Sequence, residues 1–209
     1  MRLRTALAAL LLFVASCAQF QGSEGGRHFI VAAAHPLAVD AGYDVLKRGG
    51  SALDAAIAVQ MVLGLVEPES SGIGGGAFLL YWSEKEKLLR SYDGRETAPA
   101  AARADRFLDR QGNPEEFMLA VASGRAVGVP GVPRLIERLH REHGKLQWAR
   151  LFGPAIRLAE GGFAKTRRLS RLLEREQLLR EDPAARALFY AGARIANREY
   201  AAKIGRAHV

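Results

Sequence analysis

The sequence predicts an α/β domain built around a single hydrophobic core. Three patterns support this prediction: an almost entirely apolar helix over residues 55–66, a β-hairpin over residues 77–92, and amphipathic helices after residue 130. The chain has 209 residues, of which 49% are hydrophobic and 25% charged, a composition typical of a folded globular protein. No linker divides the sequence after residue 27, so we expect one domain there.

A short strand and two helices are expected first. The apolar run 29–32 suits a buried strand. Pro36 then opens a helix, because proline fits the first helical turn, and residues 49–50 (GG) end it. Ser51 and Asp54 form a capping-box-like start for the second helix, which is apolar on nearly all sides and is expected to be buried.

A glycine-rich loop, residues 70–76 (SSGIGGG), leads from the buried helix to the hairpin. A charged turn at residues 84–87 joins the two expected strands, 77–82 and 88–92. Phosphate-binding loops follow a strand and open a helix, whereas this loop follows a helix and opens a strand, so we expect no nucleotide site. The glycines either let two backbone segments pass closely or direct N–H groups toward a substrate or its anionic intermediate, and the sequence leaves both open.

The region after residue 130 is predicted to be mainly helical. The first helix is expected to end at Gly144, and the second is expected to break at Gly153-Pro154, because proline removes a hydrogen bond inside a helix. The three apolar faces consist of Val132, Leu135, Ile136 and Leu139; of Trp148, Leu151, Phe152, Ala155, Ile156 and Ala159; and of Leu169, Leu172, Leu173 and Leu179.

Charge and ligand chemistry exclude several classes of function. The net charge is +8, but arginines alternate with acidic residues as on a solvated helix face, so we expect no nucleic-acid partner. Cys17 is the only cysteine, so no internal disulfide can form. His140 and His143 are three residues apart on a predicted helix without a third ligand, so we expect two exposed polar residues and no metal site.

The N-terminus predicts export. Arg2 and Arg4 precede an apolar run, residues 6–15, and the layout of residues 1–18 is that of a secretory signal peptide, too short to span a bilayer. Residues 14–17 (VASC) also resemble a bacterial lipobox, in which Cys17 would become the lipidated first residue; cleavage after Ala18 is the alternative. We therefore expect a periplasmic protein or one anchored to the membrane through lipidated Cys17, with residues 19–27 as a tether.

Six short segments stand out when the whole sequence is considered. They are residues 35–38 (HPLA), 49–56 (GGSALDAA), 66–76 (VEPESSGIGGG), 93–99 (DGRETAP), 126–131 (AVGVPG) and 154–159 (PAIRLA). In this order and spacing they resemble the large subunit of γ-glutamyltransferases (glutathione hydrolases). Each segment alone is weak, but the ordered set is specific and extends from about residue 28 to about residue 192.

The resemblance implies an N-terminal nucleophile hydrolase, an α/β (α+β) protein with a four-layer αββα sandwich. The precursor of such an enzyme cleaves itself, and the new N-terminal threonine of its small subunit attacks the γ-glutamyl amide with its own α-amine as base. Water, or an acceptor amino acid or peptide, then resolves the γ-glutamyl-enzyme intermediate. The implied activity of the full-length protein is transfer and hydrolysis of γ-glutamyl groups from glutathione and related compounds, and we expect no cofactor.

The resemblance also implies that only part of that protein is present. Residues 28–202 correspond to the N-terminal portion of the large subunit, and the family's threonine lies beyond residue 209, so this chain alone is expected to be inactive. Residues 203–209 do not continue the family pattern, and we expect no family structure there. The helix 55–66 and the strand 77–82 are expected to need partners from the rest of the precursor, including the small subunit.

Arg95, in the segment 93–96 (DGRE), matches the family arginine that binds the α-carboxylate of the γ-glutamyl group. A guanidinium presents a planar fork to a carboxylate, a geometry that lysine cannot copy. Without the resemblance, a surface or structural arginine paired with Glu96 or Asp93 would be the simpler interpretation.

Two other hypotheses for the chain are a non-catalytic exported lipoprotein or binding domain, and a related acylase, such as a cephalosporin acylase, on the same fold.

Overall fold

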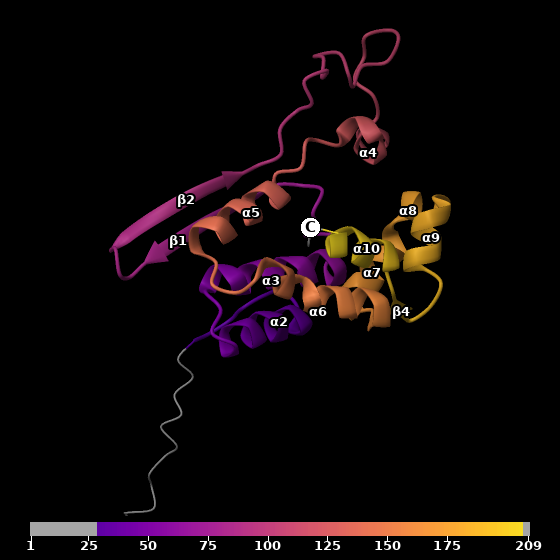
Figure 1. Cartoon of the computed structure of the whole chain (residues 1–209). Coiled ribbons are helices and arrows are strands. Elements are labelled where there is room, and N and C mark those ends of the chain that lie inside the picture. The colour runs from indigo at the N-terminus through magenta and orange to yellow at the C-terminus, as the bar shows by residue number, and fades with distance from the viewer. Residues whose placement is uncertain (1–28, 207–209) are drawn as a thin grey trace, which may run out of the picture. The chain divides into compact units, whose positions relative to one another are not determined.

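The computed structural model describes residues 29–206, and Figure 1 labels its elements. The chain divides into a unit of residues 1–30 and a unit of residues 31–209, and every helix and strand of the described residues belongs to the second unit. The helices are α2 (Pro36–Lys47), α3 (Ala52–Val66), α4 (Phe117–Ala122), η1 (Gly124–Ala126), α5 (Val132–His143), α6 (Trp148–Gly161), α7 (Arg167–Arg175), α8 (Gln177–Glu181), α9 (Pro183–Phe189) and α10 (Arg198–Gly205). The strands are β1 (Ala77–Ser83), β2 (Leu88–Gly94), β3 (Phe163–Ala164) and β4 (Arg194–Ile195).

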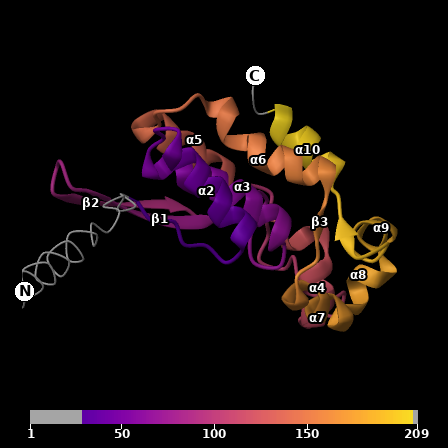
Figure 2. The same ribbon diagram turned by 90° about the horizontal axis from the view of Figure 1, so that it is seen from below.

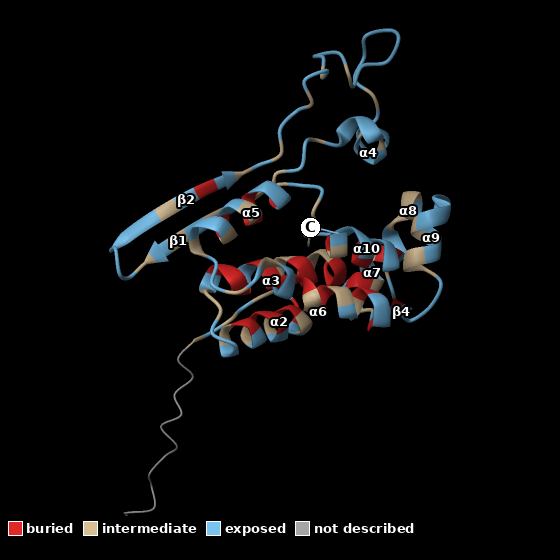
Figure 3. Cartoon of the chain, in the orientation of Figure 1, coloured by how far each residue is buried: buried red, intermediate tan, exposed pale blue. Residues whose placement is uncertain are grey.

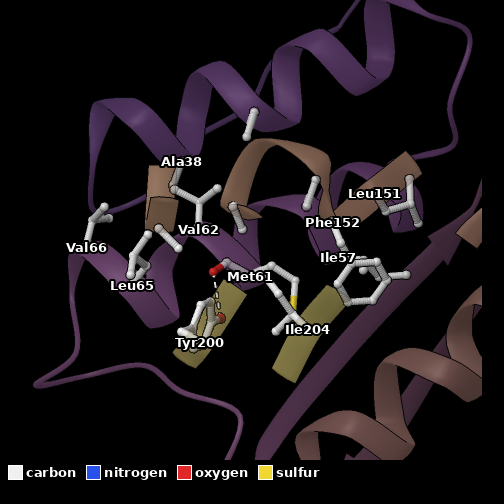
Figure 4. Close-up of a cluster of buried hydrophobic side chains, with 14 of the residues drawn as sticks. Ala38, Ile57, Met61, Val62, Leu65, Val66, Leu151, Phe152, Tyr200 and Ile204 are labelled. Carbon is white, nitrogen blue, oxygen red and sulfur yellow. Dashed lines mark hydrogen bonds between the residues drawn. The ribbon is translucent and has the colours of Figure 1, made fainter. Parts of the chain in front are cut away.

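The main core lies between α2, α3, α5, α6 and α10, with residues of α7 at its edge. The helix α3 packs against α2, α5 and α6, and α10 packs against α6 (Figure 2). Buried residues concentrate on these helices in Figure 3. In Figure 4, Val62, Phe152 and Ile204 belong to this cluster, and the Tyr200 hydroxyl donates to the Met61 carbonyl at 2.8 Å. Because α3 is covered by helices of this chain, the expectation that it needs a partner from elsewhere is wrong.

Local capping signals set the boundaries of α2 and α3. Nδ1 of His35 accepts from the backbone N–H of Leu37 at 3.1 Å, and Gly49 (φ 84°) follows the helix in the left-handed conformation. The capping box of α3 is confirmed: Ser51 N–H donates to Asp54 Oδ2 at 2.9 Å and Asp54 N–H donates to Ser51 Oγ at 3.0 Å. Asp54 Oδ2 also accepts from two backbone N–H groups beyond α5, at Lys145 and Leu146, so one buried carboxylate joins α3 to the loop before α6.

The predicted hairpin is confirmed. The strands β1 and β2 are antiparallel, with Ala77 opposite Gly94 and Ser83 opposite Leu88. The inner face of the hairpin packs against α5 and Leu53 in a second cluster; its members are Leu53, Tyr92, Leu135 and Leu139, with Leu79 and Tyr81 against them. The outer face carries Phe78, Leu80 and Trp82, which are 66%, 71% and 52% exposed.

The break expected inside α6 is wrong. The helix continues through Gly153 and Pro154 to Gly161. Proline inside a helix costs roughly 3 kcal/mol, through one lost hydrogen bond and a clash in the preceding turn. Burial offsets that cost here, because Pro154 is buried among Leu151, Phe152, Ala155 and Ala159 of the same helix, which face the core.

Other boundaries differ from the sequence-based expectations at three places. No strand forms over residues 29–34, because neither sheet of the described chain offers this segment a partner, and Ala33 packs against the helical core instead. The third apolar face is divided, since α7 ends at Arg175 and Leu179 belongs to α8. The helix α10 passes the expected boundary at residue 202 and ends at Gly205, because Ile204 is buried in the core.

The combination of core helices and a hairpin agrees with the predicted α/β class. The expected signal peptide (residues 1–18), Cys17 and the tether (residues 19–27) lie outside the described residues. Within residues 29–206, no helix is both long and apolar enough to cross a membrane.

Candidate functional site

Arg95 lies immediately after the end of β2. Its backbone N–H donates to Asp93 Oδ1 at 2.8 Å, and its Nε donates to Glu96 Oε1 at 3.2 Å. These contacts are the ones that a purely structural role would use. They leave both Nη groups without a partner among residues 29–206, and the side chain is 65% exposed. The guanidinium therefore keeps two donor groups available for a carboxylate.

The glycine loop packs against the backbone of Arg95. A Cβ atom added at Gly76 would lie 2.5 Å from the Glu96 nitrogen and 2.7 Å from the Arg95 Cα, so only glycine fits at this approach. The carbonyl of Gly75 accepts from the backbone N–H groups of Gly131 and Val132 at 3.0 and 3.1 Å. The loop thus serves the first of the two roles left open by the sequence, close passage of backbone segments.

A third segment, residues 128–132, completes the junction. Thr97 and Val129 exchange backbone hydrogen bonds, with Val129 N–H donating at 2.8 Å and Thr97 N–H at 3.4 Å. A Cβ atom at Gly131 would overlap the carbonyl oxygen of Gly94 and would lie 2.7 Å from its carbon. Three of the six sequence segments, distant along the chain, therefore meet around Arg95. We call this meeting of backbone segments the glycine junction.

The loop also presents unused backbone donors. The N–H groups of residues 72–76 find no acceptor within the described part of the chain. Beside them is a cavity of about 350 Å³ whose lining includes Gln60, Ser71 and Gly76. Nε2 of Gln60 donates to Ser71 Oγ at 2.9 Å and holds the loop against α3. The second role left open by the sequence, N–H groups directed at a ligand, is compatible with this arrangement.

An ionic contact just before the loop has no signal in the sequence. Glu67 is only 3% exposed, and its pKa is raised, first by burial and then by the charge and hydrogen bonding of Glu69, while Arg168 lowers it. Arg168 Nη1 lies 3.5 Å from Glu67 Oε2, and its Nε lies 3.4 Å from Glu69 Oε1. No local pattern could have indicated this contact, because Arg168 belongs to α7, far along the chain.

His140 and His143 were expected to be exposed, and this expectation is wrong. Their side chains are 20% and 17% exposed. Nε2 of His140 lies 2.8 Å from the Leu146 carbonyl oxygen, and Nε2 of His143 lies 2.7 Å from the Tyr92 hydroxyl. Both rings thus connect α5 to neighbouring segments. Residues 29–206 contain no group of three or more side chains that could hold a metal ion.

Comparison with known proteins gives concordant matches. The family model described as gamma-glutamyltranspeptidase matches residues 38–203. The glutathione hydrolase proenzyme of Bacillus subtilis (strain 168) is 44% identical over 145 residues, which are 69% of this chain and 25% of that protein. The chain therefore spans about a quarter of the length of this relative.

Two solved structures show the fold relationship. The gamma-glutamyltranspeptidase from Pseudomonas nitroreducens, complexed with L-DON, aligns with a TM-score of 0.79 at 29% identity, over 86% of this chain and 54% of that one. The cephalosporin acylase from Bacillus halodurans aligns with a TM-score of 0.60 at 27% identity, over 83% of this chain and 35% of that one. Both alignments cover most of this chain, and the first is the closer in shape.

Proposed function

Because the chain belongs to the γ-glutamyltranspeptidase family, we propose that it forms the N-terminal portion of the large subunit of an enzyme that transfers and hydrolyses γ-glutamyl groups. The observation that carries the proposal is the glycine junction, which holds the Arg95 backbone against Gly76, a residue of the cavity lining, and leaves both Nη groups free within residues 29–206. In this proposal Arg95 binds the α-carboxylate of the γ-glutamyl group. A bidentate pair with the guanidinium would give both charge complementarity and a fixed orientation.

In the proposed chemistry the nucleophile is the N-terminal threonine of the small subunit. After self-cleavage of the precursor, the threonine oxygen bonds to the γ-glutamyl carbonyl carbon, the amide C–N bond breaks, and the threonine's α-amine passes the hydroxyl proton to the leaving amine. Water then releases glutamate, or the amine of an acceptor amino acid or peptide forms a new γ-glutamyl amide. The role of the present chain is to bind and orient the donor substrate, glutathione or another γ-glutamyl compound.

The exposed outer face of the β1–β2 hairpin favours the presence of a partner that covers it. Phe78, Leu80 and Trp82 form one exposed apolar row on β1, in a sheet of only two strands. Contiguous apolar surface and unpaired strand edges favour association. We propose that the remainder of the same precursor, including the small subunit, covers this row.

Of the alternative functions, the related acylase has one observation in its favour, the alignment with the cephalosporin acylase from Bacillus halodurans. Its TM-score of 0.60 is lower than the 0.79 of the transpeptidase. Arg95 also favours a substrate whose acyl group carries a free α-carboxylate, as the γ-glutamyl group does. We therefore prefer the γ-glutamyl substrate.

The function is tested with the full-length, self-cleaved protein and glutathione. Release of glutamate is expected, and addition of a dipeptide acceptor should yield a γ-glutamyl tripeptide detectable by mass spectrometry. A self-cleaved protein that released no glutamate and formed no transfer product would contradict the proposal. The isomer in which glutamate is linked through its α-carboxyl group serves as the negative substrate, since it keeps the same leaving amine and lacks the γ-glutamyl amide.

We further propose export with a lipid anchor at Cys17, from the sequence pattern of residues 14–17. Cys17→Ala is expected to abolish incorporation of labelled fatty acid, because the thiol that carries the lipid is removed. Export should persist through cleavage after Ala18. Mass spectrometry of the mature wild-type N-terminus decides the matter, and an unmodified chain that begins at Gln19 would rule lipidation out.

A further inference from the structure

Arg168 connects α7 with the start of the glycine loop. Its guanidinium contacts two carboxylates, with Nη1 3.5 Å from Glu67 Oε2 and Nε 3.4 Å from Glu69 Oε1. The helix behind it is firmly placed, because Leu169 and Leu173 are buried in the main core. Arg168 therefore joins a fixed helix to the loop, and the three side chains form what we call the acid clamp.

Glu67 depends on this contact. Its side chain is 3% exposed, and Oε2 has no hydrogen-bond partner in residues 29–206, so the only favourable charge near it is that of Arg168. Its backbone carbonyl accepts from the N–H groups of Ser70 and Ser71 at 3.1 and 3.0 Å. A shift of Glu67 would therefore move the first residues of the glycine loop.

The far end of the loop reaches Arg95. Gly76 is so close to Arg95 and Glu96 that a single added carbon would overlap them, and the Gly75 carbonyl is fixed by Gly131 and Val132. The middle of the loop is open, since Cβ atoms added at Gly74 and Gly75 would meet nothing within 4 Å, so its two anchored ends are joined by the short covalent chain between them. The acid clamp and Arg95 thus lie at the two ends of one short loop segment.

We propose that Arg168 is a positioning residue of the γ-glutamyl site, which holds Glu67 and Glu69, fixes the glycine loop, and through the loop sets the position of Arg95. This inference rests on the proposed function of Arg95. The Arg168 side chain is 60% exposed, and exposed ion pairs add little to stability, so the expected role is local placement. The fork of arginine spans two carboxylates, whereas the single ammonium of lysine meets one.

The test uses the full-length enzyme and a chromogenic γ-glutamyl anilide. Arg168→Ala is expected to raise KM about tenfold, because small displacements of a binding group are costly, while kcat stays within about twofold. Arg168→Lys should give an intermediate KM, and it keeps the test informative if the alanine variant folds poorly. Arg171→Ala is the matched control, since it removes the same charge from the same helix and Arg171 has no ion-pair partner within residues 29–206.

A second comparison separates this inference from the proposed function. In an Arg95→Ala background, Arg168→Ala should raise KM by no more than about twofold, because its effect passes through Arg95. An undiminished tenfold effect in that background, or equal KM values for Arg168→Ala and Arg171→Ala, would overturn the proposal while leaving the enzyme's function intact. A wild-type enzyme without turnover of the anilide would overturn the proposed function, and the positioning role with it.

Discussion

Replacement of Arg95 by alanine in the full-length protein is expected to lower kcat/KM for glutathione roughly 30-fold to several-thousand-fold. This corresponds to a loss of about 2–5 kcal/mol of transition-state stabilisation. The substrate α-carboxylate would lose a partner that supplies charge-assisted hydrogen bonds, each contributing about 1.5–3 kcal/mol. The exposed position of Arg95, with its Nη groups free, makes an effect on folding small by comparison. Steady-state kinetics over a range of glutathione concentrations measures the loss.

The form of this loss is also predicted. It should appear mainly in KM if the carboxylate contact is equally strong in the ground and transition states. Arg95→Lys should recover only part of the activity, because lysine keeps the charge but not the fork. Self-cleavage should be unaffected, since that reaction does not involve the substrate. A kcat/KM within about twofold of wild type would leave Arg95 as a structural partner of Glu96.

Gly131→Ala is expected to have the largest effect on stability. The added Cβ atom would overlap the Gly94 carbonyl oxygen and lie 2.9 Å from the Arg95 carbonyl oxygen. Both neighbours are backbone atoms of the glycine junction, so they cannot move aside as a flexible side chain would. Such overpacking costs typically 1–3 kcal/mol and occasionally more, and we expect about 3 kcal/mol or more here.

Thermal unfolding of the full-length protein measures this effect, with Gly74→Ala as the matched control. Gly74 lies in the glycine loop, and an added Cβ atom there meets nothing within 4 Å. The control should therefore change stability by less than about 0.5 kcal/mol, as a surface substitution does. Equal melting temperatures for the two variants would show that the glycine junction is not closely packed.

Elements with local signals could be predicted from the sequence. The capping box at Ser51 and Asp54, the glycine at position 49 and the charged turn of the hairpin act within a few residues, so their patterns identify the ends of elements directly. Arg95 could be singled out only through the ordered family segments. Its chemistry alone did not distinguish it from the other arginines of the chain.

Contacts between distant segments could not be predicted. The continuation of α6 through Pro154 depends on its burial against the core, which overrides the local preference of proline. The acid clamp joins residues on α7 and before the glycine loop, and the inward orientation of His140 and His143 depends on where the hairpin and the loop after α5 pack. A single sequence does not indicate which distant residues lie close together in the fold.

Recognition of the substrate α-carboxylate by Arg95 is tested most directly by removing the carboxylate from the substrate. The measurement compares kcat/KM for a γ-glutamyl anilide and for the γ-aminobutyryl anilide, which lacks only that group, in wild type and in Arg95→Ala. The wild-type enzyme should strongly prefer the γ-glutamyl substrate, and Arg95→Ala should lose most of that preference while its activity on the γ-aminobutyryl substrate stays near that of wild type. If Arg95→Ala instead lowered kcat/KM by the same factor for both substrates, Arg95 would not bind the α-carboxylate.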